Sequence, residues 1–139
     1  MLSVYIAGAS DELERCKSVI QQARRVPGLR VTLDWTLSID FYGGADQRPD
    51  SEREANAQLD FDAIERADML WLLLPETHSK GVWAELGYAV RLRRVRQFEI
   101  IVSRQDESLQ EGRLPLFVTL ADEIYPTDRS AFAYLRSLL

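Results

Sequence analysis

Glu85 lies in the stretch Ser-Lys-Gly-Val-Trp-Ala-Glu-Leu-Gly-Tyr-Ala, residues 79–89, the part of the sequence that most strongly indicates chemistry. Apolar residues at helical spacing predict a helix over residues 81–94. Glu85 would then lie one turn into the helix, where the positive end of the dipole should keep its carboxylate ionised. Such a carboxylate, facing a cleft, can act as a nucleophile. The same spacing also fits a glutamate on a solvated helix face.

Two turns could bind an anion. Ser79 precedes the predicted helix, where unpaired backbone N–H groups and a hydroxyl suit a phosphate. It could equally serve only as the helix cap. Gly81 would let the backbone approach a ligand, and Gly87 would allow close packing of the helix on a sheet. The turn that contains Gly8 and Ser10 offers a similar anion site, without a full phosphate-loop pattern.

Three other residues are candidates for a site, and each has an ordinary alternative. The Tyr5 phenol, within the first predicted strand, could orient a carboxylate or simply pack in the core. Asp60, on the second predicted helix, could face the cleft or be solvated. Trp35 could stack on a nucleobase or occupy the rim of the core. His78 has no evident partner in the sequence, and we interpret it as a surface residue.

The elements that position these residues follow from apolar periodicity and from turn residues. Strands are predicted at residues 2–7, 29–33, 69–74, 98–102 and 116–120. Helices are predicted at 11–25, 52–67, 81–94 and 127–139, with loops at 75–80 and 104–113. This order predicts an α/β layer fold with a mainly parallel sheet and right-handed crossovers. In such sheets ligands bind beyond the carboxyl ends of the strands, so the loops at 8–11, 34–36 and 75–81 matter most.

Residues 38–51 contain two consecutive glycines, a proline and scattered polar residues, which predict a loop that could include one short ordered turn. A loop of about 14 residues is long for a compact domain, and such loops are usually functional or disordered. The pair Phe41-Tyr42 suggests that this segment folds back over another part of the molecule.

Composition excludes several classes of site. One cysteine, Cys16, rules out an intrachain disulfide framework, and one histidine rules out a multi-His metal site. A net charge of −5 argues against a nucleic-acid polymer as partner. The longest apolar run, residues 69–74, is far shorter than the roughly 20 residues of a membrane span, and no signal peptide is evident. We expect one cytoplasmic domain over residues 1–139, with no membrane contact, metal or other cofactor, and with Cys16 as a buried thiol.

Three motifs resemble the nucleoside 2-deoxyribosyltransferase-like superfamily. They are Val-Tyr-Ile-Ala-Gly at residues 4–8, an aspartate (Asp60) eight residues before another (Asp68), and Ser-x-Gly-x-x-x-Glu-Leu-Gly-Tyr-Ala at residues 79–89. The resemblance spans residues 2–102. This superfamily includes base-exchanging transferases and 2′-deoxynucleoside 5′-phosphate N-hydrolases.

The resemblance implies a flavodoxin- or Rossmann-like three-layer sandwich with a five-stranded, mainly parallel sheet, and cleavage of an N-glycosidic bond. By it, Glu85 matches the catalytic nucleophile, Tyr5 the tyrosine that holds that glutamate, and Asp60 an aspartate for acid–base work or sugar positioning. A retaining sugar transfer does need an ionised carboxylate nucleophile and help for the departing base. Members of this kind often build the site across a dimer, so we expect a homodimer or higher homo-oligomer.

Ser79 departs from the transferases, which carry an aspartate six residues before the nucleophile. A serine there resembles the nucleotide N-hydrolases, where it contacts a 5′-phosphate, and this favours a nucleotide substrate and water as acceptor. We expect the substrate to contact Gly8, Ser10, Trp35, Ser79 and Gly81. The base, the sugar, and hydrolysis versus transfer stay open. Two alternatives remain: a TIR-like domain that cleaves NAD, and a non-catalytic nucleotide-binding or sensor module.

Overall fold

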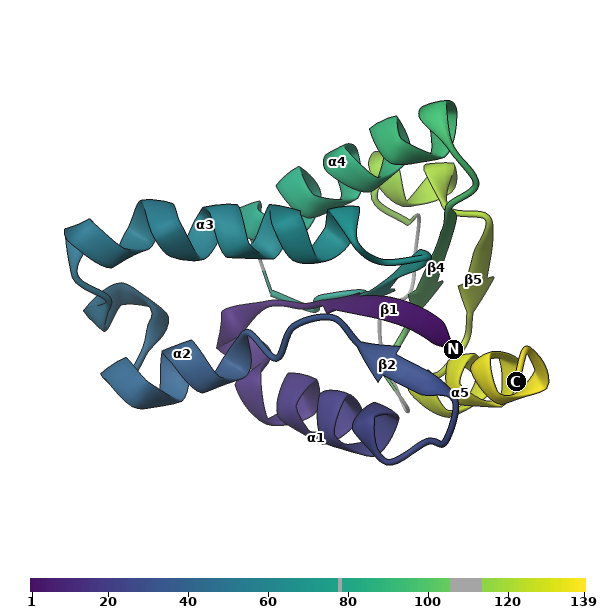
Figure 1. The fold of residues 1–139 in the computed structure, drawn as a ribbon, viewed down its shortest axis with the longest axis horizontal. Helices are drawn as coiled ribbons and strands as arrows, with labels where there is room; N and C mark the ends of the chain where they lie inside the picture. The colour runs from purple at the N-terminus through teal and green to yellow at the C-terminus, as the bar shows by residue number, and fades with distance from the viewer. Residues whose placement is uncertain (78, 106–113) are drawn as a thin grey trace.

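Strands and helices alternate along most of the chain in the computed structural model, which describes residues 1–77, 79–105 and 114–139 (Figure 1). The strands are β1 (Leu2–Ala7), β2 (Leu29–Val31), β3 (Met69–Leu73), β4 (Glu99–Ser103) and β5 (Glu123–Tyr125). The α-helices are α1 (Leu13–Arg24), α2 (Thr36–Tyr42), α3 (Asp50–Glu65), α4 (Lys80–Val95) and α5 (Asp128–Ser137). Three 3-10 helices also form: η1 (Ser10–Glu12), η2 (Ala45–Gln47) and η3 (Leu116–Leu120).

The five strands form one sheet in the order β2-β1-β3-β4-β5, and every neighbouring pair is parallel. This confirms the predicted α/β fold. From β1 the chain moves outward to β2 and then returns past β1 to β3, so the direction of the connections reverses between β1 and β3. Crevices at such a reversal are the usual ligand sites of open α/β sheets.

The two faces of the sheet bury separate cores, because successive side chains of a strand point to opposite faces. In β3, Leu70 and Leu72 belong to one core, while Trp71 and Leu73 belong to the other. Helices α3 and α4 cover the first face, and α1 and α5 cover the second (Figure 1). The predicted three-layer sandwich is therefore confirmed, with β3 buried on both faces as its run of apolar residues indicates.

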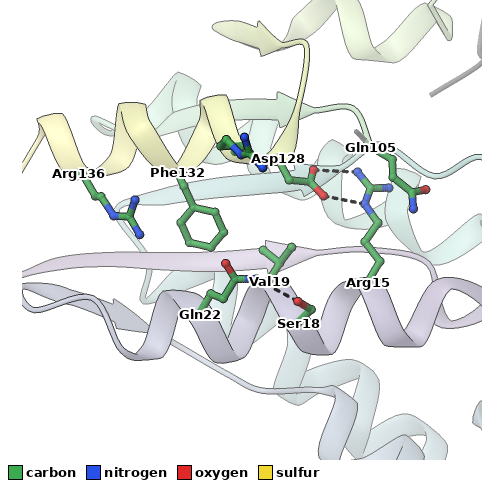
Figure 2. Close-up of a pocket in the computed structure, with 9 residues that line it drawn as sticks. Arg15, Ser18, Val19, Gln22, Gln105, Asp128, Phe132 and Arg136 are labelled. Carbon is green, nitrogen blue, oxygen red and sulfur yellow. Dashed lines mark hydrogen bonds and ion pairs between the residues drawn. The ribbon is translucent and has the colours of Figure 1, made fainter. Parts of the chain in front are cut away.

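Helices α1 and α5 face each other across a groove (Figure 2). The Phe132 ring packs edge-on against Trp71 of the sheet at a centroid distance of 4.8 Å. At the other end of the groove, Arg15 of α1 forms an ion pair with Asp128 of α5 at 2.9 Å. Cys16 is buried in this layer as a free thiol, which confirms the expectation for it.

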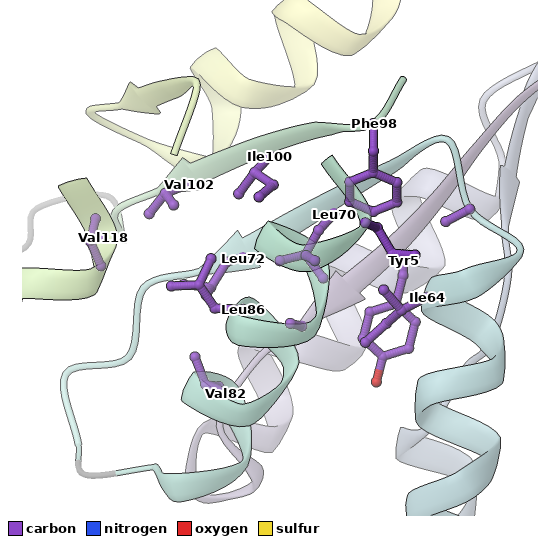
Figure 3. Close-up of a cluster of buried hydrophobic side chains, with 14 of the residues drawn as sticks. Tyr5, Ile64, Leu70, Leu72, Val82, Leu86, Phe98, Ile100, Val102 and Val118 are labelled. Carbon is purple, nitrogen blue, oxygen red and sulfur yellow. The ribbon is translucent and has the colours of Figure 1, made fainter. Parts of the chain in front are cut away.

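Helix α3 packs on the sheet through its last turns, and Asn56 in its first half accepts a hydrogen bond from Ser38 of α2 at 3.0 Å. Ala63 and Ile64 are buried against the sheet, while the first part of the helix is almost entirely exposed and extends beyond the sheet (Figure 1). Figure 3 shows Ile64 beside the Tyr5 ring in this core. The anchored end of α3 is therefore the part that can place side chains next to the end of β1.

The prediction of a loop over residues 38–51 is wrong for residues 38–42, which belong to α2, and for residues 50–51, which begin α3. Local signals for α2 are present: Asp34 Oδ1 accepts a hydrogen bond from the Thr36 backbone at 3.2 Å, and Gly43 ends the helix with a φ of +79°. The Phe41-Tyr42 pair does not fold the segment back either, because Phe41 is 80% exposed.

The fifth strand forms at Glu123–Tyr125, and the strand predicted at 116–120 is wrong. Residues 116–120 form η3, whose one buried residue is Val118. An edge strand of three residues is too short to produce a periodic pattern, whereas η3 has the apolar composition of a strand. Residues 106–113 of the loop predicted at 104–113 lie outside the described residues, as does His78. No described helix combines the length and apolar character that crossing a bilayer requires.

Candidate active site

A pocket of about 490 Å³ lies at the carboxyl ends of β1 and β3, where the strand order reverses. Four segments line it: the turn after β1, the start of α2 with the connection to α3, one face of α3, and the first turns of α4. The lining residues are Gly8, Ala9, Ser10, Asp11, Trp35, Ile39, Asp46, Arg48, Arg53, Asp60, Ser79, Lys80, Gly81 and Glu85. Asp60, Glu85 and all the residues that we expect to contact substrate are thus brought together.

Tyr5, Asp60 and Glu85 meet at the inner end of this pocket, although they are far apart in sequence. Tyr5 is 1% exposed and belongs to the core beneath the pocket, not to its lining. Burial raises the pKa of the Tyr5 hydroxyl, and the charges and hydrogen-bonding of the Glu85 and Asp60 carboxyl groups raise it further, so the hydroxyl lies beside both. The Oε2 atom of Glu85 is buried and has no hydrogen-bond partner among the described residues. A phenol therefore bridges two carboxyl groups, and one carboxyl oxygen remains without a partner.

Burial dominates the protonation of this cluster. It raises the pKa of Glu85 to about 8; the nearby Asp60 charge adds to the rise and the Tyr5 hydrogen bond opposes it. Burial also raises the pKa of Asp60 to about 6, against the opposing effects of Arg48 and Tyr5. The expectation that the helix dipole keeps Glu85 ionised is therefore wrong for the unliganded protein, since desolvation of the buried carboxylate outweighs it.

Ser79 is the N-cap of α4, where its Oγ accepts a hydrogen bond from the Val82 backbone at 3.4 Å. It also lines the pocket. Because Oγ accepts from the helix, its own O–H stays available as a donor. The two interpretations of Ser79, helix cap and anion contact, are thus compatible in this geometry.

The turn after β1 and the start of α2 form the opposite wall. A Cβ atom at Gly8 would overlap the Cys16 sulfur, so glycine is needed there for close packing on α1. Trp35 is held by its indole N–H, which donates to the Ile6 carbonyl at 2.8 Å, and this fixes its ring beside the end of β1. Close helix–sheet packing at Gly87 is not observed, because a Cβ atom there would meet open space.

The sequence reasoning missed the cationic part of the lining, which consists of Arg48, Arg53 and Lys80. The two arginines flank the start of α3, in or just beyond the predicted loop at residues 38–51. Only Lys80 carried a local signal, because it adjoins the Ser79 motif. Arg48 acts electrostatically on Asp60, which places a positive charge near the carboxyl cluster.

A second cavity, of about 660 Å³, is the groove between α1 and α5, and it contains none of the predicted site residues (Figure 2). Among residues 1–77, 79–105 and 114–139, no three His, Cys, Asp or Glu side chains are grouped so that they could hold a metal ion. The buried carboxyl cluster and the pocket above it are therefore the best candidate for chemistry in the described residues.

No protein-family model and no curated protein matches this sequence. Among solved structures, the fold is similar to that of a CMP N-glycosidase from Clostridium botulinum, BcmB, with a TM-score of 0.59. The two structures correspond over 99% of this chain and 99% of that chain, at 15% sequence identity. A likeness at this identity establishes the fold, so the chain shares its α/β architecture from end to end with an enzyme that acts on a nucleotide.

Proposed function

We propose that this chain is an enzyme that cleaves the N-glycosidic bond of a nucleotide, with Glu85 as nucleophile. The observation that carries the proposal is the Glu85 carboxyl group, which lines the pocket with an unpartnered buried oxygen beside Tyr5 and Asp60. Buried carboxyl groups with raised pKa values are typical of catalytic sites. The end-to-end structural likeness to a CMP N-glycosidase, and the motifs of the nucleoside 2-deoxyribosyltransferase-like superfamily, support the same reaction and membership of that superfamily.

The reaction needs an ionised nucleophile and an acid for the departing base. In the unliganded protein the proton resides mainly on Glu85, since the pKa of Glu85 is about 8 and that of Asp60 about 6. Transfer of this proton to Asp60 through the Tyr5 hydroxyl would supply the ionised nucleophile, Glu85, and the acid, Asp60, in one step. Tyr5 is suited to this transfer because it is hydrogen-bonded to both carboxyl groups.

The steps then balance as follows. A Glu85 carboxylate oxygen bonds to the anomeric carbon of the sugar, and the carbon–nitrogen bond to the base breaks. The base takes up the proton of Asp60 as it leaves. Water next attacks the anomeric carbon of the glycosyl ester, Asp60 accepts the proton of that water, and the Glu85 carboxylate is released.

A nucleotide with a 5′-phosphate is the substrate that the lining favours. Ser79 can donate its hydroxyl to a phosphate oxygen at the start of α4. Lys80, Arg48 and Arg53 add positive charge to the lining of a chain whose net charge is −5. We therefore propose hydrolysis of a nucleoside 5′-monophosphate, with Gly8, Ser10, Trp35 and Gly81 completing the substrate contacts.

The test is incubation with CMP, dCMP, other nucleoside monophosphates and cytidine, followed by chromatography for free base. Wild type should release base from a monophosphate faster than from the matching nucleoside. Glu85→Ala should lower release on the order of 1,000-fold or more, because it removes the nucleophile. Lack of release from every substrate, or equal release by Glu85→Ala, would contradict the proposal.

Two additions to this assay distinguish hydrolysis from base transfer and from NAD cleavage. A second free base added to the reaction would become part of a new nucleotide if the enzyme were a transferase. NAD as substrate would release nicotinamide if the site were of the TIR-like kind. Thermal stabilisation by nucleotides without any turnover would instead identify a binding module.

We also propose that the protein is a homodimer. Apolar side chains on the exposed faces of α2 and α3 support this: Leu37 is 60% exposed, Phe41 80% and Leu59 51%. Leu37 and Phe41 are four residues apart and so share one face of α2, and adjoining exposed apolar side chains are typical of interaction surfaces. Light scattering coupled to size-exclusion chromatography measures the mass directly, and a monomer at micromolar concentration would contradict the proposal.

A further inference from the structure

The Glu12 side chain joins two loops that are distant in sequence and that both reach the candidate site. Its Oε2 atom accepts hydrogen bonds from the Glu76 backbone at 2.8 Å, the Thr77 backbone at 3.3 Å and the Thr77 hydroxyl at 3.1 Å. Glu12 ends η1, directly after the turn that contains Ser10. Residues 76 and 77 belong to the connection from β3 to α4, which leads to Ser79.

The other oxygen of Glu12 is fixed by a largely buried arginine. Oε1 pairs with Arg15 at 3.1 Å, and the Arg15 side chain is 8% exposed. The same guanidinium donates to the Leu74 carbonyl at 2.8 Å, just beyond the end of β3. Its Nε and Nη2 atoms meet Asp128 at 3.0 and 2.9 Å, as the dashed lines of Figure 2 show, and Nη2 also donates to the Ser103 carbonyl of β4 at 3.4 Å. Arg15 is thus held by four segments of the chain, and it holds Glu12 in one orientation.

The four groups that bond to the Glu12 carboxylate all act as hydrogen-bond donors to it, so the position favours a side chain that only accepts. We propose that Glu12 is a positioning residue for the candidate site. It ties the turn after β1 to residues 76–77, and in this way sets the position of Ser79 and of the start of α4. The effect on catalysis rests on the proposed function, whereas the effect on the loop does not.

Glu14 is a matched control. It lies one residue beyond the start of α1, its side chain is 94% exposed, and its nearest cation, Lys17, is 3.9 Å away. A general effect of removing a carboxylate from this part of the chain would appear in Glu14→Ala as well as in Glu12 variants. A positioning effect should appear in the Glu12 variants alone.

Amide hydrogen exchange of the full chain tests the placement without any substrate. Glu12→Ala should speed exchange of the Glu76 and Thr77 amides about 10-fold or more, because charge-assisted hydrogen bonds are lost. Glu12→Leu keeps a side chain of similar size that has no acceptor oxygen, and it replaces Glu12→Ala in the experiment if Glu12→Ala fails to fold. Glu12→Gln, which retains one acceptor oxygen, should restore part of the protection. Exchange in β3 and in Glu14→Ala should match wild type. Unchanged exchange at residues 76 and 77 in both Glu12→Ala and Glu12→Leu would overturn the proposal.

Kinetics with CMP test the consequence for the site. If the loop sets the position of the phosphate contact, Glu12→Ala should raise KM about 10-fold while kcat stays within about 3-fold. A fall in kcat at unchanged KM would overturn the assigned role. If wild type itself cleaves no nucleotide, the proposed function fails, and the exchange experiment still decides whether Glu12 places the loop.

Discussion

Two groups of carboxyl side chains are largely buried in this molecule, one with a guanidinium between its members and one without. Arg15 lies between Glu12 and Asp128, and these two bonds outweigh the effect of burial and raise the pKa of Arg15. Asp60 and Glu85 share only the Tyr5 phenol, and burial raises the pKa of both. The first group holds elements together, whereas in the second group burial favours the protonated form of both carboxyl groups.

The difference lies in what compensates for lost hydration. A buried carboxylate that bonds a guanidinium recovers much of its desolvation cost, and its charge is then committed to that partner. A buried carboxyl group beside a neutral phenol retains a proton at a pH where an exposed one would be ionised. A cation bonded between buried carboxylates therefore keeps them ionised, whereas burial beside a phenol favours the retained proton that the proposed role of Glu85 uses.

The largest stability change should come from removing that cation. Arg15→Met leaves Glu12 and Asp128 uncompensated, and we expect it to cost about 3–5 kcal/mol of the free energy of unfolding. Arg93→Met is the matched control, because it breaks a more exposed pair with Asp122 and should cost less than about 1 kcal/mol. Urea denaturation at pH 7 measures both. Similar costs for the two variants would erase the distinction between the buried and exposed pairs.

At Glu85 we expect a substitution to raise the free energy of unfolding, the opposite of the effect at Arg15. Its folded-state pKa of about 8 lies above the ordinary value of 4.5, so wild type loses stability as the pH rises from about 4.5 through about 8. Glu85→Gln should remove this loss and be more stable than wild type at pH 8.5 by roughly 2–4 kcal/mol. Thermal unfolding from pH 5 to pH 9 measures the difference in stability between Glu85→Gln and wild type, which should become smaller toward pH 5. A difference that stays constant with pH would show that Glu85 does not titrate in this range.

The smallest effects separate the two neighbours of Glu85. Tyr5→Phe removes a hydrogen bond that lowers the pKa of Glu85, so that pKa should rise above about 8. Asp60→Asn removes a negative charge that raises it, so that pKa should fall. Each change should be about one pH unit. Carboxyl ¹³C NMR titration measures both, and shifts of the same sign would contradict this account of the cluster.

Most of the fold could be predicted from local patterns. The strand at residues 69–74 is a continuous apolar run, and α1 and α4 show helical periodicity, so their types follow from burial. Helix α2 and β5 could not be predicted in this way. Seven residues of α2 and three of β5 contain too few apolar positions for a period to be evident.

The candidate site could be predicted only in part. Gly8, Ser79 and Glu85 follow strand ends or begin a helix, and parallel strands place such positions at one edge of the sheet. Arg48 and Arg53 occupy the same pocket because α2 and the protruding start of α3 bring them there, which the sequence does not indicate. Local patterns do not indicate the roles of Glu12 and Arg15, because their partners lie about 60 to 113 residues away.

The sequence by itself determined most of the helices and strands, the parallel direction of the sheet, and the edge of the sheet where carboxylates, a serine and glycines gather. These depend on apolar periodicity and on strand direction, which are local properties. Only the tertiary structure decided the charge of those carboxylates. Whether Glu85 holds its proton depends on its burial and on the distance to Asp60, Tyr5 and the nearest cation, and those distances exist only after the helices pack on the sheet.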